Sequence, residues 1–283
     1  MTLPPVARAA LRAFIVLNAI VGVVTYITLL ERKFAARMQS RIGPYYVGWP
    51  HGWLQPIADA IKLMIKEDVV PTPADRVVYN LAPLVFLVPC MLIFATIPFA
   101  PGLGLADLNI GVLFFLAVSA LEIVGLFMGG WGSNNKYALL SAMRAVNQII
   151  SYDLPFIFAA LVPVLLTGSM QMSAIVNAQQ GGAGWFVLYP VIGQLAFLAY
   201  LIAALAAENR VPFDILEAES ELVAGFRVEY SGMKFALIQL GEYAHMLGRR
   251  SSARSCSWAA GSGRGRRGWG RSGSCSRPCS CSW

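Results

Sequence analysis

The sequence has few charged residues: Asp, Glu, Lys and Arg make up 13% of its 283 residues. A soluble domain carries about a quarter. Hydrophobic residues make up 57%, and the mean hydropathy is +0.60. Several apolar stretches reach the length of about 20 residues that is needed to cross a bilayer. The sequence therefore predicts an all-α fold, a polytopic transmembrane helix bundle, and excludes an ordinary soluble domain.

Binding motifs are also absent from residues 1–247. They contain no GxGxxG, P-loop, CxxC pair or HExxH, and their one cysteine is Cys90. These are the motifs that hold nucleotides, iron–sulfur clusters and catalytic zinc. We therefore expect no cofactor to be bound by this chain alone, no metal site and no residue that acts as a catalyst by itself.

Acidic residues are missing from the last part of the chain. Residues 248–283 contain eight Arg, four Cys and no Asp or Glu, whereas residues 1–247 carry 14 Lys and Arg against 15 Asp and Glu. A segment so poor in apolar periodicity cannot bury enough surface to fold alone. We predict two regions: a transmembrane domain over residues 1–247 and a basic, disordered or frame-shifted tail over residues 248–283. Alternatives for the tail are an arm that binds anionic lipid or nucleic acid, or a Cys-based metal site.

Five to six membrane spans are predicted. They cover about residues 11–30, 81–99, 110–130, 138–166 and 185–207, and a sixth begins at Met233 and stops after about 15 residues, near residue 247. The fourth is long and is expected to be tilted or broken at Pro155. Residues 54–67 place apolar side chains at helical spacing with Asp59, Lys62 and Lys66 off that stripe, which predicts an amphipathic helix lying in the membrane interface.

The orientation follows from the distribution of Lys and Arg between alternate loops. The segments 31–78, 131–148 and 208–234 carry these residues, and the segments 100–109 and 167–184 carry none. Basic loops remain in the cytoplasm. We therefore expect a multi-pass protein of the bacterial (inner) membrane with a periplasmic N-terminus and a cytoplasmic acidic loop.

Carboxylates next to apolar segments are the strongest functional signal. The segment ENRVPFDILEAESELVAGFRVEYSGMK holds six of them, and Glu122, Asp153 and Glu242 lie within predicted spans. A carboxylate in a membrane is costly unless it is paired, hydrated or used in proton movement. Interacting carboxylates also titrate as a group, which can store or pass protons.

Three long motifs identify a family. They are ERKFAARMQSRIGPYYVG followed by LQPIADAIKLMIKED, then GGWGSNNKYALLSAMRAVNQIISYDLP, then AAENRVPFDILEAESELVAGFRVEYSGMKFALIQLGEYA. Together they resemble the H-subunit family of NADH-quinone oxidoreductase, the membrane component of respiratory complex I that joins the quinone-reducing arm to the proton-pumping arm. The resemblance covers residues 1 to about 247.

The resemblance implies a bundle of eight membrane helices that forms a quinone chamber together with peripheral-arm subunits. Ubiquinone or menaquinone would enter that chamber as substrate from the lipid bilayer, and a partner's iron–sulfur cluster would reduce it. The chain would then be part of an enzyme, a translocase, without a redox centre of its own. Its partners would be the quinone-site and iron–sulfur subunits and the antiporter-like membrane subunits, with no nucleic acid.

The resemblance also assigns residues. The entrance and wall of the quinone chamber would comprise Glu31, Arg32, Arg41, Gln55, Asp59 and Lys62. The path that carries protonation changes toward the antiporter-like subunits would comprise Glu122, Asp153, Glu208, Asp214, Glu217, Glu219, Glu221, Glu229 and Glu242.

The sequence departs from the family pattern in three places. Asp153 stands where the family has Glu, the stretch GPYYVGWPHGWLQP is one residue longer than usual, and the Arg/Cys tail replaces the end of the sixth helix and two more helices. Alternative functions are the homologous subunit of a membrane-bound hydrogenase-type complex, a stand-alone proton or ion transporter, or a structural membrane anchor. A transporter built on an inverted repeat would show internal symmetry, and we detect no such repeat.

Overall fold

The computed structural model describes residues 5–48, 51–99, 104–179, 185–210, 212–214 and 225–254. Their regular elements are helical. The α-helices are α1 (Pro5–Met38), α2 (Gln55–Ile65), α3 (Arg76–Leu92), α4 (Gly111–Ala120), α5 (Glu122–Gly132), α6 (Lys136–Thr167), α7 (Met172–Ala178), α8 (Ile192–Ala207) and α10 (Gly232–Ala253). Short 3-10 helices cover Ile93–Ala95, Phe186–Leu188 and Gly225–Arg227 (η4). The predicted all-α fold is confirmed.

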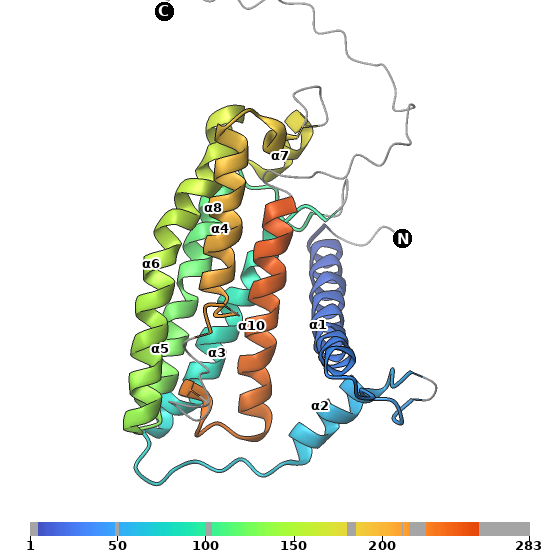
Figure 1. Cartoon of the computed structure of the whole chain (residues 1–283), viewed down its shortest axis with the longest axis vertical. Helices are drawn as coiled ribbons and strands as arrows, with labels where there is room; N and C mark the ends of the chain where they lie inside the picture. Colours follow the sequence, from blue (N-terminus) through green and yellow to red (C-terminus); the bar gives the residue numbers. More distant parts are fainter. Residues whose placement is uncertain are drawn as a thin grey trace, which may run out of the picture.

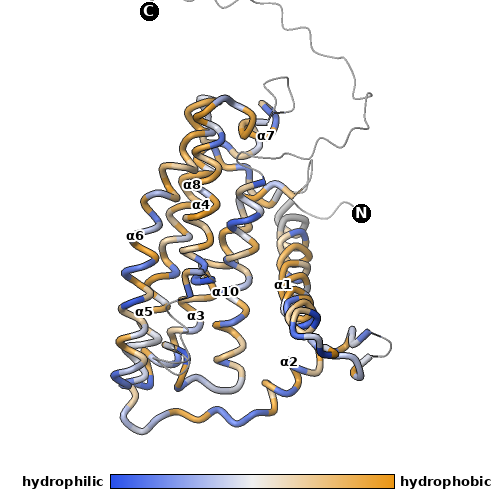
Figure 2. The backbone as a smooth tube through the Cα atoms, viewed as in Figure 1, coloured by the Kyte–Doolittle hydropathy of each residue, from blue (hydrophilic) through white to orange (hydrophobic). Residues whose placement is uncertain are grey.

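Most helices form one bundle. Figure 1 shows α3, α4, α5, α6, α8 and α10 running along a common direction, with α1 standing beside α10 and α2 lying obliquely at one end. Among the described residues, four segments are long and apolar enough to cross a membrane: Ala10–Met38, Arg76–Ala95, Gly111–Gly132 and Lys136–Thr167. The helix α8 is a shorter apolar helix. Hydrophobic residues predominate along these helices, whereas on α10 hydrophilic residues alternate with hydrophobic ones (Figure 2).

Glycines allow the central helices to approach closely. A Cβ placed on Gly125 of α5 would lie 2.5 Å from the main-chain nitrogen of Phe86 on α3. On α10, a Cβ at Gly241 would lie 2.8 Å from the ring of the same phenylalanine. Small residues at such crossings are typical of membrane helices, because packing between lipid-embedded helices depends on close van der Waals contact. Phe86 is therefore the point at which α3, α5 and α10 meet.

Two predicted spans differ from the structure: the fifth, predicted over residues 185–207, is an α-helix only from Ile192, where α8 begins, and the fourth is unbroken. The span predicted over residues 110–130 is found as Gly111–Gly132, in which the single residue Leu121, itself in right-handed helical backbone, separates α4 from α5. The break predicted as one alternative at Pro155 is absent, since α6 continues from Lys136 to Thr167 with Pro155 and Pro163 inside it. Neighbouring helices satisfy the carbonyls that a proline frees, so membrane helices tolerate proline.

The sixth predicted span forms as the helix α10, which continues past the predicted stop but is not among the described segments that are apolar enough to cross a membrane. We expected it to stop near residue 247, but α10 continues to Ala253. Arg249 in this extension is fully buried. Arginine and alanine both favour helical backbone, and burial of Arg249 attaches the extra turn to the bundle. The residues from 255 onward lie outside the described part of the chain.

The predicted amphipathic helix forms as α2. Its bounds, Gln55–Ile65, fall within the predicted residues 54–67. The stripe side chains Ile57, Ile61 and Met64 are more than half exposed. An exposed apolar stripe on a helix beside membrane spans is what an interfacial helix presents to lipid.

Candidate functional site

The helix α10 carries ionisable side chains on one face. Glu242, His245 and Arg249 follow one another at spacings of three and four residues, which places them along a single side of the helix. Each of them contacts an ionisable residue from a different element. Helix α10 is thus the element that assembles the charged interior of the bundle.

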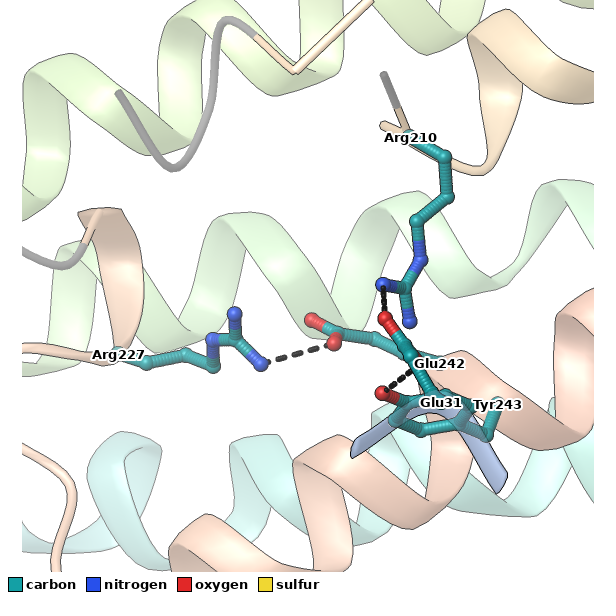
Figure 3. Close-up of polar contacts among 5 residues, drawn as sticks. All are labelled: Glu31, Arg210, Arg227, Glu242 and Tyr243. Carbon is teal, nitrogen blue, oxygen red and sulfur yellow. Dashed lines mark hydrogen bonds and ion pairs between the residues drawn. The ribbon is translucent and has the colours of Figure 1, made fainter. Parts of the chain in front are cut away.

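The first pair joins Glu242 to Arg227 on η4. An arginine NH1 lies 2.8 Å from Oε2 of Glu242, and both side chains are largely buried (Figure 3). The guanidinium also lies over the rings of Phe226 and Phe235. A buried carboxylate retains its charge only when such a partner is present.

The neighbouring residue on α10 forms a second cluster. The hydroxyl of Tyr243 donates a hydrogen bond of 2.6 Å to Glu31 on α1, and Arg210 forms an ion pair of 2.9 Å with the other oxygen of Glu31 (Figure 3). The guanidinium of Arg210 lies 4.7 Å from the centre of the Tyr243 ring. These three residues, which we call the Glu31 triad, connect α1, the segment after α8 and α10.

Two further pairs lie deeper. Nδ1 of His245 contacts Oε2 of Glu122, the first residue of α5. Arg249 lies 3.6 Å from Oδ1 of Asp153 on α6, with its guanidinium 5.1 Å from the ring centre of Phe156. Glu122 follows Leu121, the single residue that separates α4 from α5.

A polar cavity of about 110 Å³ lies between the Glu242–Arg227 pair and the contact of His245 with Glu122. Its lining includes Glu122, Glu208, Asp214, Glu242, Arg210, Arg227 and His245. The side chain of Gln148 on α6 positions one wall, because it donates 2.8 Å hydrogen bonds to the carbonyls of Ala206 and Phe213. A cavity of this volume and polarity has room for several water molecules.

Glu208 lies at the C-terminal end of α8, beside the cavity. Burial raises the pKa of its carboxyl to about 7, although Arg249, Arg250 and Arg210 oppose this effect. Its protonation therefore changes near neutral pH, where a group that exchanges protons is most useful.

The residues predicted to line the quinone chamber lie in several places. Arg32 forms an ion pair with Asp59, which also accepts a hydrogen bond of 3.1 Å from Gln55. Arg41 donates to Gln39 instead. Lys62 lies in the last turn of α2, and Glu31 belongs to the Glu31 triad. The structure thus brings α1 and α2 together through Arg32, Asp59 and Gln55.

Five of the residues predicted for the proton path gather around the cavity and the deeper pairs: Glu122, Asp153, Glu208, Asp214 and Glu242. Glu229 lies apart and accepts a hydrogen bond of 2.7 Å from Asn135. Glu217, Glu219 and Glu221 lie outside the described residues.

Sequence reasoning did not assign the partners of these acids. Arg210, Arg227, Tyr243, His245 and Arg249 were not assigned to either site. The three-residue spacing from Glu242 to His245 could have identified the histidine. Arg249 falls within the predicted tail, whose eight arginines gave no reason to single out one of them. Within the described ranges, no group of three or more His, Cys, Asp and Glu side chains could hold a metal ion.

Fold and site define a class of protein: a polytopic helical membrane protein with ion pairs and a polar cavity inside its bundle. The family model described as NADH dehydrogenase matches residues 11–251. The NADH-quinone oxidoreductase H-subunit of Dehalococcoides mccartyi is 54% identical over 228 residues, 81% of this chain and 62% of the relative. The proteins of the same name from Geobacillus thermodenitrificans and Bacillus cytotoxicus are 49% and 44% identical, over 82% and 84% of this chain and 68% and 70% of the relatives.

The chain belongs to the H-subunit family of NADH-quinone oxidoreductase, as its motifs predicted. It spans 62% of the length of the Dehalococcoides relatives.

Proposed function

We propose that this chain is a membrane subunit of a proton-pumping NADH:quinone oxidoreductase. It forms a quinone chamber with peripheral-arm subunits, and it transmits quinone reduction to proton translocation through a path of carboxylates. Ubiquinone or menaquinone is the substrate, and the electrons come from a partner subunit. The names of the relatives support the oxidoreductase, and the apolar helices support a membrane location.

The Glu31 triad is the observation that supports coupling most strongly. It begins on α1, the helix that also provides Arg32 to α2, and it ends at Tyr243, whose neighbour Glu242 is paired with Arg227. A change in charge or position at the α1 side would therefore act on two adjacent residues of α10. Buried hydrogen-bonded networks respond as units, because each member's charge influences the others.

The remaining assignments follow from this arrangement. The chamber side comprises α1 and α2, and the path continues through Glu242, Glu208, Glu122 and Asp153 toward antiporter-like membrane subunits. The basic loops favour a cytoplasmic location for the α2 end of the bundle in a bacterial inner membrane, where peripheral-arm subunits bind.

Tyr243→Phe tests the proposal. The substitution keeps the ring beneath Arg210 but removes the hydrogen bond to Glu31. A hydrogen bond to a charged group contributes about 1.5–3 kcal/mol, so we expect the rate of quinone reduction coupled to proton translocation to fall about tenfold or more. The complete oxidoreductase is assayed in proteoliposomes for NADH oxidation and proton translocation together.

Tyr137→Phe is the matched control, since Tyr137 is exposed at the start of α6. Normal assembly with reduced coupled turnover in Tyr243→Phe only would support the proposal. Equal activity of both variants would refute the role of the Glu31 triad.

A further inference from the structure

The helix α6 exposes a continuous stripe of side chains along one side. Its other sides pack within the bundle, where Ala142 meets Gly130 of α5 and Phe156 contacts Tyr200 of α8. Alternating spacings of four and three residues of this kind form the seam along which two helices pack nearly parallel. The residues at these spacings are all exposed, and we call them the α6 stripe: Leu140, Arg144, Asn147, Ser151, Leu154 and Phe158.

The centre of the α6 stripe lies about halfway through the membrane-crossing part of the bundle. The segment before α3 and the end of α5 meet at one end of the bundle, where the main-chain nitrogen of Asp75 donates to the carbonyl of Gly132. Helix α6 begins shortly after Gly132, at Lys136, and Asn147 lies about 16 Å further along it. The span Arg76–Ala95 starts at the same end and covers about 30 Å.

The polar residues at this depth are poorly suited to lipid. Asn147 is exposed, and within the described part of the chain its amide has no hydrogen-bond partner. The hydroxyl of Ser151 donates to the carbonyl of Asn147 at 2.7 Å, inside the same helix. Lipid tails offer no hydrogen bonds, so an unpartnered amide among them is costly. Unlike the long side chain of Arg144, these two side chains are too short to reach the aqueous interface.

The exposed sides of two other helices differ from the α6 stripe. Helix α1 also exposes an asparagine, Asn18, but its amide donates a hydrogen bond of 2.8 Å to the carbonyl of Phe14 in the same helix. Apolar side chains are what lipid favours. From its second turn onward, α3 exposes apolar residues alone: Leu81, Leu84, Val88 and Leu92.

We propose that the α6 stripe is the docking surface for one transmembrane helix of a partner membrane subunit. From Leu140 to Phe158 the stripe extends about 27 Å, which one spanning helix covers in a hydrocarbon layer of about 30 Å. That helix carries small residues along its contact face and a hydrogen-bonding side chain level with Asn147, because such side chains join helices inside membranes. The inference rests on the proposed function, which supplies the partner subunits.

The polarity and charge of the chain argue against two other occupants. A second copy would insert in the same orientation, so a two-fold contact along the stripe would place Arg144 opposite its own copy. Like charges at such a contact are repulsive. Residues 255–283 of this chain contain no apolar run of about 20 residues, so they cannot supply a spanning helix.

Photo-crosslinking in the complete oxidoreductase, in native membranes, identifies the occupant. The photoreactive residue p-benzoylphenylalanine replaces Ser151, or Leu84 of α3 as the matched control. We expect residue 151 to form an adduct with a transmembrane peptide of another subunit of the oxidoreductase, and residue 84 to form adducts with lipid. Leu154, which is 59% exposed, carries the probe where the variant at 151 fails to assemble.

Asn147→Leu distinguishes a protein contact from exposure to lipid. Leucine is favoured over asparagine in lipid, so on a lipid-facing side the substitution would leave subunit association unchanged. Against a partner helix it removes an interhelical hydrogen bond. We then expect the membrane subunits of the detergent-solubilised oxidoreductase to dissociate about three to twenty times faster. Asn18→Leu is the matched control, because the amide of Asn18 bonds within its own helix.

An adduct from residue 151 with a partner subunit, together with faster dissociation of Asn147→Leu only, supports the proposal. Adducts with lipid alone, or with a second copy of this chain, overturn it. If the chain still purifies with the oxidoreductase in that case, the proposed function remains in place. A chain that does not purify with an oxidoreductase overturns both.

Discussion

The crossing of α5 and α3 provides a quantitative test of the fold. In Gly125→Ala the new Cβ would lie 2.5 Å from the main-chain nitrogen of Phe86, about 1 Å inside an ordinary contact of about 3.5 Å. Backbone cannot move aside as a flexible side chain can, so α3 and α5 must separate. Overpacking of this kind costs about 1–3 kcal/mol.

Gly22→Ala on α1 is the matched control, since no atom lies within 4 Å of its added Cβ. Both variants gain helix propensity of about 1 kcal/mol. The difference between them therefore isolates the overpacking cost of about 1–3 kcal/mol.

Thermal inactivation of the detergent-solubilised complex measures this difference. We expect Gly125→Ala to inactivate at a lower temperature than the wild type, and Gly22→Ala at the same or a higher temperature. Equal stability of the two variants would show that α3 and α5 do not approach this closely.

Two further predictions concern the site and its surroundings. Since burial raises the pKa of Glu208 to about 7 from 4.5, the folded state binds the proton more tightly, and the free energy of unfolding falls as pH rises between these values. Glu208→Gln should flatten this dependence in thermal unfolding at stepped pH, and an unchanged slope would contradict the burial. Asn135→Ala removes two hydrogen bonds. One is the N-cap of α6, in which the main-chain nitrogen of Tyr137 donates to the Asn135 side chain at 3.0 Å, and the other is the bond that Asn135 donates to Glu229. It should cost about 1–2 kcal/mol, and Asn135→Ser should recover much of that in the same unfolding assay.

Hydropathy and motifs predicted much of the fold. The amphipathic helix was located to within two residues at each end. The helical spacing of its apolar residues can be read from that short segment alone, without knowledge of the rest of the fold. The third span was predicted from its apolar composition and is found as Gly111–Gly132, whereas the one-residue irregularity at Leu121 has no signal in that apolar sequence. The predicted stop near residue 247 was wrong. It was placed where the composition changes, at Gly248, but the burial of Arg249 in α10 depends on its contacts with Asp153 and Phe156 of α6.

The candidate site shows the same limit. Carboxylates in apolar segments are visible in the sequence, and five of those predicted meet around the cavity or the deeper pairs. Their partners come from distant positions: Tyr243 reaches Glu31, and His245 reaches Glu122. Such pairings depend on how the helices pack, so one sequence without structure cannot reveal which acid is neutralised by which base.

A double-mutant cycle on Tyr243→Phe and Glu242→Gln tests the central claim most directly. The rate of coupled proton translocation is measured in proteoliposomes for the wild type, both single variants and the double variant. If the Glu31 triad and the Glu242–Arg227 pair act as one unit, the double variant will lose little more than the more damaged single variant. Losses that multiply independently would contradict the claim that these adjacent residues of α10 connect the quinone chamber to the proton path.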